Sequence, residues 1–427
     1  VLVISFSLYQ AFVVPNQNAG IELNHNSEVQ SQLQELRNAI HGIAGGNPGS
    51  GVTVNLGTTY PTRVVALNPP PPSGRLYTEG TRNPSVNLTI VNATADGETG
   101  DLWNGSARPY NTGGIAYEPN YNEYRDPPTT IYENSLVYNQ FESQTLSLTD
   151  QSLISGDRIS IVTLNGSFDR SGSRSMTVDP EPISTSDRTI SVADGTGPIT
   201  LNITTRLSVD RWQTLLNDED NVLTADIRTA PDTDSVPDPF RRVLIPLNRS
   251  ETYTLGMTKV GVGSGVSEES GEYLTLVDRP SRSIRNGSSH FITLEVRDRF
   301  NNPVSGFPVN AMVSGGGQFE SGGTSASTIT NPAGQAVFNY TAPAGEQSPN
   351  LQFNITEGTP QAYEEVSFGL ETYLTGEGES GNATVSVDAT YGGLSDFASQ
   401  YDGATNSAEE LFTQANGKWT NVNQTGR

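Results

Sequence analysis

The first part of the chain carries two hydrophobic patterns in succession. Residues 1–14 (VLVISFSLYQAFVV) are almost continuously apolar and uncharged. After Pro15 and a polar stretch, apolar residues recur at intervals of four, three, four and three positions, which is the stripe of an amphipathic helix. We therefore expect an apolar helix that continues through a kink at Pro15 into an amphipathic helix ending near residue 45, where Gly45, Gly46 and Pro48 stop it. The stripe consists of Val29, Leu33, Leu36, Ile40 and Ile43.

Three interpretations of residues 1–14 remain open. A membrane-spanning helix needs about 20 apolar residues, so this run is too short to span a bilayer alone. A translated chain begins with Met, whereas this one begins with Val1, so the chain is either processed before Val1 or lacks upstream residues. Processing gives a pilin-like subunit whose apolar helix packs against copies of itself in a filament core, and missing residues give the outer end of a membrane anchor. In the third interpretation the run is a buried β-strand, which suits Val, Ile, Phe and Tyr.

In the filament interpretation, the surface that joins subunits lies along this helix. Packing helices into a bundle stabilises the assembly by about 25 cal/mol for each Å² of apolar surface buried, which favours a polymer over dispersed subunits. The expected assembly residues are Leu2, Ile4, Phe6, Leu8, Phe12, Val29, Leu33, Leu36 and Ile40.

From Gly51 onward, short β-like runs alternate with turn residues. The last clear run alternates Ile199, Leu201 and Ile203 with polar residues, as in a strand with one solvated face. Many turns between short runs favour a β-sandwich. One helix is expected after Ser208, which can cap it, with Val209, Trp212 and Leu216 on one face and Trp212 as a packing anchor. The strand candidates are residues 52–56, 63–67, 86–91, 159–164, 189–192 and 199–203.

Residues 97–141 are rich in Tyr and Trp. These rings could form a platform for a sugar or for a partner's surface, because aromatic faces bury a large area and keep a polar tip. Alternatively, they hold loops to a β core through their hydroxyl groups, which is the interpretation we favour. The aromatic residues are Trp103, Tyr110, Tyr117, Tyr121, Tyr124, Tyr132 and Tyr138.

The charge balance indicates where the protein works. The chain has 47 acidic and 24 basic residues, a net charge of −23, and Lys occurs only at Lys259 and Lys418. An acidic surface poor in Lys keeps a protein dispersed where salt screens ordinary repulsion. The composition is therefore typical of an exported halophile protein. Nucleic acid is not an expected partner, because there is no basic patch to contact phosphates.

Further features agree with export. Cys is absent, which excludes disulfides and thiolate metal sites. No second apolar run long enough to span a membrane follows the first, so the rest of the chain is expected on one side of it. N-glycosylation sequons exceed the number expected by chance. The candidate sites are Asn87, Asn92, Asn104, Asn165, Asn202, Asn248, Asn286, Asn339, Asn354, Asn382 and Asn423.

Candidate catalytic chemistry is sparse. His25, His41 and His290 are scattered, and no nucleophile elbow, phosphate-binding loop with Lys or zinc-protease motif occurs. Acidic clusters at residues 218–220 and 232–238 offer oxygen ligands for Ca²⁺, but without the spacing of a known calcium loop we favour a solvated surface. We expect no enzyme activity, no cofactor and no metal site. An exported hydrolase with a carboxylate pair is the remaining enzymatic alternative.

The most specific local pattern lies in two separated blocks. In FITLEVRDRFNNPVSGFPVNAMV and NPAGQAVFNY, strand-like alternation is interrupted by turns at Asn302–Pro303 and Gly334. Over residues 281–370 the chain resembles the bacterial Ig-like domain, group 1, of invasin-type surface proteins. The resemblance implies a β-sandwich spacer or adhesion module. The matching residues are Val296, Asp298, Asn302, Pro303, Val304, Gly306, Pro308, Val309, Gly334, Gln335, Ala336 and Phe338.

A looser resemblance covers residues 1–276. The apolar start, VPNQNAGIELNHN, a helix ending in LRNAI, GETGDLWNGS and PNYNEY are similar to pilin-like surface proteins of haloarchaea. Compared with archaeal type IV pilins, the apolar helix, the kink and the β-rich head match, whereas the cleavage site is not visible and the head is larger. The resemblance implies no biochemical activity.

These patterns predict a mainly β protein in which a kinked N-terminal helix precedes tandem β-sandwich, Ig-like domains. The expected units are a helix over residues 1–45, a β-rich head over 46–278 built as one unit or two sub-domains, an Ig-like sandwich over 279–370 and a C-terminal segment over 371–427. In the last segment, residues 383–391 could complete a neighbour's sheet edge, and a short helix is expected over 407–414.

The functional hypothesis is a structural subunit of an extracellular, type IV pilus-like filament, with the helix in the core and glycosylated β domains facing the medium for adhesion or surface contact. Its partners would be copies of itself, the membrane during assembly, and surface glycans or other cells. The alternative is a monomeric, membrane-anchored adhesin or binding protein.

Overall fold

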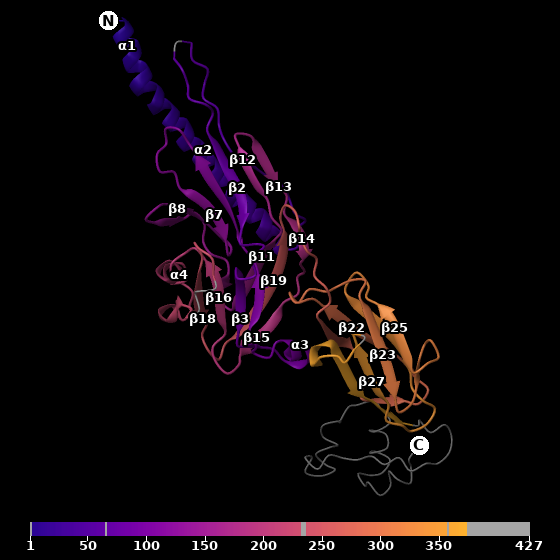
Figure 1. Ribbon diagram of the computed structural model, residues 1–427. Coiled ribbons are helices and arrows are strands. Elements are labelled where there is room, and N and C mark those ends of the chain that lie inside the picture. Colours follow the sequence, from indigo (N-terminus) through magenta and orange to yellow (C-terminus); the bar gives the residue numbers. More distant parts are fainter. Residues whose placement is uncertain (1, 65, 232–235, 357, 374–427) are drawn as a thin grey trace, which may run out of the picture.

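The computed structural model describes residues 2–64, 66–231, 236–356 and 358–373 (Figure 1). The chain is mainly β, with a long helix at its N-terminal end followed by sandwich-like domains, and this confirms the expected fold class. The strand and helix expected at residues 383–391 and 407–414 lie outside the described residues.

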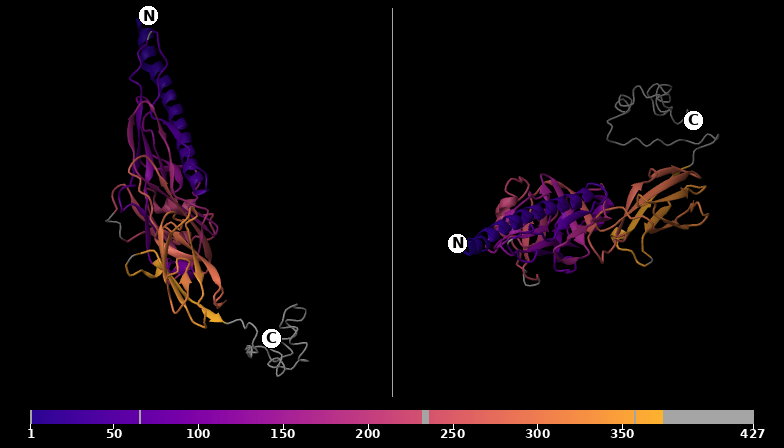
Figure 2. Two further views of the ribbon diagram at one scale, coloured as in Figure 1. Left: turned by 90° about the vertical axis from the view of Figure 1, so that its right-hand side faces the viewer. Right: turned by 90° about the horizontal axis from the view of Figure 1, so that it is seen from above.

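The N-terminal helix is continuous. α1 (Leu2–Leu8), the π-helical turn η1 (Tyr9–Val13) and α2 (Val14–Ala44) follow one another without a break. The helical interpretation of this run is therefore confirmed, and the strand interpretation is wrong. Pro15 has no N–H to donate to the carbonyl four residues earlier, and the wider π-helical turn before it accommodates the missing bond. The helix lies along the head and then extends beyond it (Figures 1 and 2).

The head contains three large sheets. The first is antiparallel, with the order β12-β2-β6-β7-β8-β9. Its strands are β2 (Ser73–Glu79), β6 (Gly114–Asn120), β7 (Thr129–Glu133), β8 (Leu136–Gln140), β9 (Thr145–Ser147) and β12 (Asp169–Gly172).

The second large sheet has the order β10-β11-β19-β15-β4, with β14 also paired to β19. Its pair β11–β19 is parallel and its other pairs are antiparallel. The strands are β4 (Ala93–Thr94), β10 (Ile154–Ser155), β11 (Arg158–Asn165), β14 (Glu181–Ser184), β15 (Ile190–Asp194) and β19 (Thr252–Gly261).

The third large sheet has the order β17-β18-β16-β3-β5, and a two-stranded sheet pairs β1 with β13. The strands are β3 (Asn87–Val91), β5 (Arg108–Asn111), β16 (Thr200–Thr205), β17 (Arg228–Thr229), β18 (Arg241–Pro246), β1 (Val52–Asn55) and β13 (Ser175–Val178). Short helices are α3 (Gly97–Leu102), α4 (Val209–Leu215) and the 3₁₀ turn η2 (Thr224–Asp226).

The hydrophobic patterns of the sequence predicted several of these strands and the helix α4. Five strand candidates coincide with β1, β3, β11, β15 and β16 to within two residues. The candidate at residues 63–67 is wrong, because its described residues form no strand. They enter a run of four prolines, residues 69–72, which have no N–H groups for a β-ladder. α4 is confirmed, with the Ser208 hydroxyl accepting a hydrogen bond from the Arg211 N–H at 3.3 Å and Trp212 fully buried.

The head has two apolar core clusters. One surrounds Trp212 and Leu201. In the other, the stripe of α2 packs against the sheets through residues such as Val54, Tyr117 and Val260. The stripe therefore attaches the helix to the head.

The Ig-like module is a sandwich of two four-stranded antiparallel sheets, as the resemblance implied. One has the order β20-β22-β26-β24 and the other β25-β23-β27-β28, and a short parallel pair joins β21 to β29. The elements are β20 (Tyr273–Asp278), β21 (Ser283–Arg285), β22 (Ser289–Arg297), β23 (Pro308–Ser314), β24 (Gln318–Phe319), β25 (Ser325–Ile329), β26 (Gln335–Thr341), β27 (Asn350–Asn354), η3 (Ala362–Glu364), β28 (Glu365–Gly369) and β29 (Glu371–Tyr373).

The two sequence blocks of the resemblance meet in space. Ile292, Leu294 and Val296 point into the core that both sheets share. Gly334 has φ +72°, and a Cβ there would lie 2.5 Å from the Cβ of Pro303. The close approach of the two turns thus requires glycine at this position.

Candidate functional site

The part of the helix beyond the head presents large apolar side chains to solvent. Phe6, Leu8 and Phe12 are 41, 53 and 67% exposed. The loop of residues 57–72 adds Val64 and Leu67, which are 98 and 81% exposed. We call Phe6, Leu8, Phe12, Val64 and Leu67 the helix-tip surface. Apolar groups of this size gain free energy when a partner removes them from water.

Hydrogen bonds attach the loop to the helix. The Gln10 amide donates to the Leu67 carbonyl at 2.9 Å and accepts from the Leu67 N–H at 3.0 Å. The Arg63 guanidinium donates to the side-chain oxygens of Gln17 at 2.6 Å and Asn18 at 3.0 Å. The loop and the helix tip therefore form one surface.

A buried carboxylate fixes the helix below this surface. Glu22 is fully buried and accepts hydrogen bonds from the successive backbone N–H groups of Asn122, Glu123 and Tyr124 at 2.9, 2.8 and 2.5 Å. The Tyr60 hydroxyl donates to it as well. Successive N–H groups form a concave site for an anion, and here the anion belongs to the helix itself. The sequence contains no signal for this contact, because Glu22 lies outside the apolar stripe and its partners are about a hundred residues away in the chain.

His25, one helical turn after Glu22, also joins the helix to the head. Its Nδ1 lies 2.7 Å from the Tyr121 hydroxyl and its Nε2 lies 3.1 Å from the Asn55 carbonyl oxygen. Burial lowers the pKa of His25 below its usual value. The segments VPNQNAGIELNHN and PNYNEY, which carried the looser resemblance, are thus partners in one helix-to-head junction.

The structure divides the expected assembly residues into two groups. Phe6, Leu8 and Phe12 are exposed, and Leu2 and Ile4 lie in α1. The other group is fully buried against the chain's own sheets, so it does not offer a surface to another subunit. The expectation that the stripe joins subunits is therefore wrong. Periodicity shows that one face of a helix is buried, but it does not show whether the same chain or another subunit covers that face. The buried residues are Val29, Leu33, Leu36 and Ile40.

Most of the aromatic-rich region is core. The hydroxyl contacts of the favoured interpretation are present at Tyr110 and Tyr117, which donate to the Arg299 and Leu56 carbonyls. The region's members that are at most 1% exposed are Trp103, Tyr110, Tyr117, Tyr132 and Tyr138. Tyr121 and Tyr124 remain partly exposed and stack with ring centroids 5.8 Å apart. The described rings therefore do not form a continuous exposed platform.

Polar contacts join the Ig-like module to the head. The Asp298 carboxylate accepts from the Ser184 hydroxyl at 2.5 Å and from the backbone N–H groups of Phe300 and Asn302 at 2.8 and 3.0 Å. Burial raises the pKa of Asp298 to about 6. The Asn302 amide donates to the Ser184 hydroxyl at 2.7 Å. Asp298 and Asn302, two positions of the Ig-like resemblance, thus contact the neighbouring unit.

An aromatic contact adds to this junction. The Tyr110 hydroxyl donates to the Arg299 carbonyl at 2.9 Å, and the Tyr110 and Phe300 rings pack with centroids 5.0 Å apart. The module therefore has a defined position at the end of the head, opposite the helix tip (Figure 1).

The glycosylation candidates differ in how free their amide groups are. Asn87 is 7% exposed and donates through Nδ2 to the Pro84 carbonyl at 2.8 Å. Asn104 is exposed. Asn382 and Asn423 lie outside the described residues. The partly exposed candidates are Asn92, Asn165, Asn202, Asn248, Asn286, Asn339 and Asn354.

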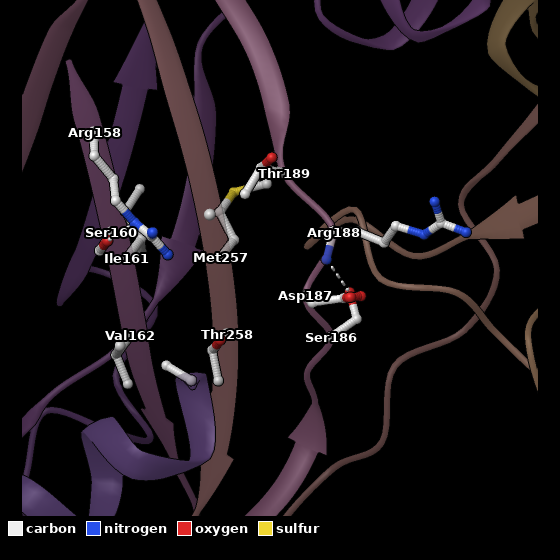
Figure 3. A pocket seen from close by; sticks show the side chains of 12 residues that line it. Arg158, Ser160, Ile161, Val162, Ser186, Asp187, Arg188, Thr189, Met257 and Thr258 are labelled. Atoms are coloured by element: carbon white, nitrogen blue, oxygen red, sulfur yellow. Dashed lines mark hydrogen bonds between the residues drawn. The ribbon is translucent and has the colours of Figure 1, made fainter. Parts of the chain in front are cut away.

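A small cavity lies where the second head sheet meets the segment before β15 (Figure 3). Its volume is about 50 Å³, enough for one or two water molecules. Arg158 and Met257 line it, whereas the Arg188 side chain points away from them. Arg188 instead pairs with Glu295 of the Ig-like module at 2.9 Å. The lining side chains do not converge on a substrate-sized space.

Metal-ligating side chains do not cluster in the described part of the chain. No group of three or more His, Asp or Glu residues there is placed to hold a metal ion. Asp218, Asp220 and Asp238 are exposed, and Asp232 and Asp234 lie outside the described residues. His25, His41 and His290 make separate contacts with Tyr121, Ser152 and Ser288 respectively.

Glu133 is a buried titratable group of the head. It is 2% exposed and accepts from the Thr205 hydroxyl and the Arg206 N–H. Burial raises the pKa of Glu133 to about 7, and the nearby Glu79 carboxylate adds to this shift. Arg206 opposes the shift only in part, because its guanidinium pairs with Glu79.

This environment predicts a pH-dependent stability. Between about pH 4.5 and 7 the folded state keeps the Glu133 proton that the unfolded state loses, so stability falls as pH rises through this window. Replacing Glu133 with Gln keeps an acceptor for Thr205 and Arg206 and removes the buried charge. We expect Glu133→Gln to be more stable than the native chain at pH 8 by about 1–3 kcal/mol and to be equal to it near pH 4.

Urea unfolding at several pH values measures this effect. Glu118→Gln, on the exposed side of β6, is the matched control and should follow the native profile. A Glu133→Gln protein with an unchanged pH profile would contradict the raised pKa.

None of the helices in the described part of the chain combines the length and the apolar character that crossing a membrane requires. No protein-family model matches the chain, and no curated protein matches it.

Comparison with solved structures finds remote similarities. The D00-D0 domain of intimin is 13% identical over 46% of this chain and 99% of its own, with a TM-score of 0.22. The Yersinia pseudotuberculosis adhesin InvE is 10% identical over 46% of this chain and 53% of its own, with a TM-score of 0.20. Domains 4 and 5 of the S-layer protein SbsC are 13% identical over 31% of this chain and 65% of their own, with a TM-score of 0.18. At these TM-scores the Ig-like assignment rests on the chain's own strands.

Proposed function

We propose that this protein is a structural subunit of an extracellular, type IV pilus-like filament, in which the projecting helix packs against copies of itself. The observation that carries the proposal is the division of the helix near Val14. From Val14 onward one face of the helix is buried, since Val14, Asn18 and Glu22 are each at most 1% exposed. Phe6, Leu8 and Phe12 lie before this point and are exposed.

The energetics favour assembly over a dispersed subunit. Full burial of one large apolar side chain contributes about 1.5–3 kcal/mol. Phe6, Leu8 and Phe12 repeat on every copy, so a helical bundle would gather many such contributions. The junction at Glu22 and His25 supports the proposal because it holds the helix at a fixed angle to the head, as a regular polymer requires.

The remaining parts suit the outside of such a filament. The chain's net charge of −23 keeps the protein hydrated, and the scarcity of Lys is typical of an exported haloarchaeal protein. The Ig-like module lies at the end opposite the helix tip (Figure 2), where it can take part in adhesion or surface contact. The protein carries out no catalysis in this proposal.

The test is a double substitution in the helix-tip surface. We expect Phe6→Ser with Phe12→Ser to raise the subunit concentration required for assembly by about 100-fold, because two rings lose about 3 kcal/mol of burial between them. Electron microscopy and sedimentation after detergent removal measure this concentration. The folding of the head should be unchanged, since neither ring belongs to its core clusters.

Leu23→Ser is the matched control, because Leu23 is 51% exposed on the same helix but lies outside the helix-tip surface. It should leave assembly intact. Filaments that persist in the double variant, or a native protein that yields only dispersed particles, would contradict the proposal.

The alternative is a monomeric adhesin whose helix continues a membrane anchor. Intact-mass measurement of the protein from its membrane-containing source separates the two. A mature chain that begins at or near Val1 favours the filament, and a longer apolar segment before Val1 favours the anchor.

A further inference from the structure

The sheet β20-β22-β26-β24 of the Ig-like module has an outer face with two different ends. At one end Glu295 is fully buried, because Arg188 of the head pairs with it at 2.9 Å and Arg297 at 2.6 Å. Phe291 lies four residues earlier on the same strand and the same face, and it is 64% exposed. The head thus covers one end of this face and leaves a large aromatic ring uncovered at the other.

Two exposed valines lie on the strands beside β22. Val337 on β26 is 46% exposed and pairs with Thr293, the next outward residue of β22 after Phe291. Val277 on β20 is 48% exposed. Residues directly opposite in an antiparallel pair have Cβ atoms about 5 Å apart. In the β22–β26 register the residue directly opposite Phe291 is Asn339, which begins the sequon Asn339-Tyr340-Thr341.

The geometry of this sequon suits modification. Tyr340 is fully buried, so Asn339 and Thr341, on either side of it, both face outward. The Asn339 Oδ1 is buried without a partner, and within the described residues no hydrogen bond involves its Nδ2. The Nδ2 of Asn87 donates to Pro84 and that of Asn248 donates to Asp220, at 2.8 and 2.7 Å. Those two amides would have to break a bond before reacting.

We infer that Asn339 is N-glycosylated and that its first sugar covers the exposed ring of Phe291. The sugar donor would be a lipid-phosphate-linked oligosaccharide, delivered by the transferase of the exporting cell. The Asn339 Nδ2 forms a bond to C1 of the sugar, the bond from C1 to the phosphate oxygen breaks, and the lipid phosphate leaves with the electron pair. One amide proton passes to a base of the transferase. The inference rests on the export that the proposed function includes, and not on assembly.

The contact between the sugar and the Phe291 ring is favoured by the removal of apolar surface from water. One face of a pyranose ring presents C–H groups, which pack on an aromatic face and remove both from water. The hydroxyl groups at the edge of the sugar remain solvated. The glycan would thus convert exposed apolar surface into polar surface and stabilise β22 against β26.

A mutant cycle on the full chain, produced in a host that N-glycosylates exported proteins, tests the inference. Glycopeptide mass spectrometry should find a sugar on Asn339. Calorimetry should show that Asn339→Gln lowers the Tm of the Ig-like module by about 4 °C, and that most of this loss disappears in a Phe291→Ala background. Both readouts work on dispersed subunits, so failed assembly leaves them unaffected.

Asn354 provides the matched control. It begins a sequon on the other sheet, where its cross-strand neighbours are Asn310 and Glu365 and no aromatic ring lies opposite. Asn354→Gln should change Tm equally with and without Phe291. An unmodified Asn339, or an Asn339→Gln effect that is the same in both backgrounds, would overturn the inference.

Discussion

Replacing Glu22 with Ala is expected to lower the free energy of unfolding by about 3–5 kcal/mol. The substitution leaves the part-buried N–H groups of Asn122, Glu123 and Tyr124 without the carboxylate that accepts from them. Each buried donor that loses its partner costs about 1–3 kcal/mol. Denaturant unfolding gives the size of the loss.

Hydrogen exchange shows which segments the Glu22→Ala substitution destabilises. We expect faster exchange at residues 14–28 and 120–126, while the Ig-like module keeps its protection. Glu35→Ala is the matched control, because Glu35 is exposed on the same helix, and it should cost less than about 0.5 kcal/mol. A Glu22→Ala protein as stable as this control would show that the junction does not hold the helix.

Replacing Leu36 with Ala is expected to cost about 2–5 kcal/mol, the range for removing a fully buried leucine side chain. Leu36 belongs to the cluster that joins α2 to the head sheets. The loss should therefore appear in dispersed subunits, at any protein concentration. Thermal and denaturant unfolding over a hundredfold range of concentration measures it.

Leu23→Ala is the control on the same helix, since Leu23 is half exposed and lies outside both head clusters. It should change stability by less than about 1 kcal/mol. If Leu36→Ala weakened only the assembled form, the stripe would be a contact between subunits, contrary to its burial within one chain.

The aromatic residues show where sequence reasoning reached its limit. Trp212 was recognised as a core residue because a cap and a helical face surround it, and it is fully buried. The sequence does not single out Phe291, although this residue lies in a clear strand, because alternation alone does not show whether the outward face is covered. Four residues along the same face, Glu295 is buried, since the head folds over it.

Local chemistry in the sequence determined the amphipathic helix, the turn-rich β architecture and the Ig-like module, because periodicity, caps and turn residues act over a few neighbouring positions. The charge balance likewise belongs to the composition alone. The tertiary structure decided which apolar residues stay exposed. Leu33 and Phe12 look alike in the sequence, yet one is buried in the head and the other lies beyond it. The same holds for Glu22, whose partners lie about a hundred positions away in the chain. Contacts between such distant segments depend on how the sheets come together, and short-range patterns do not record this.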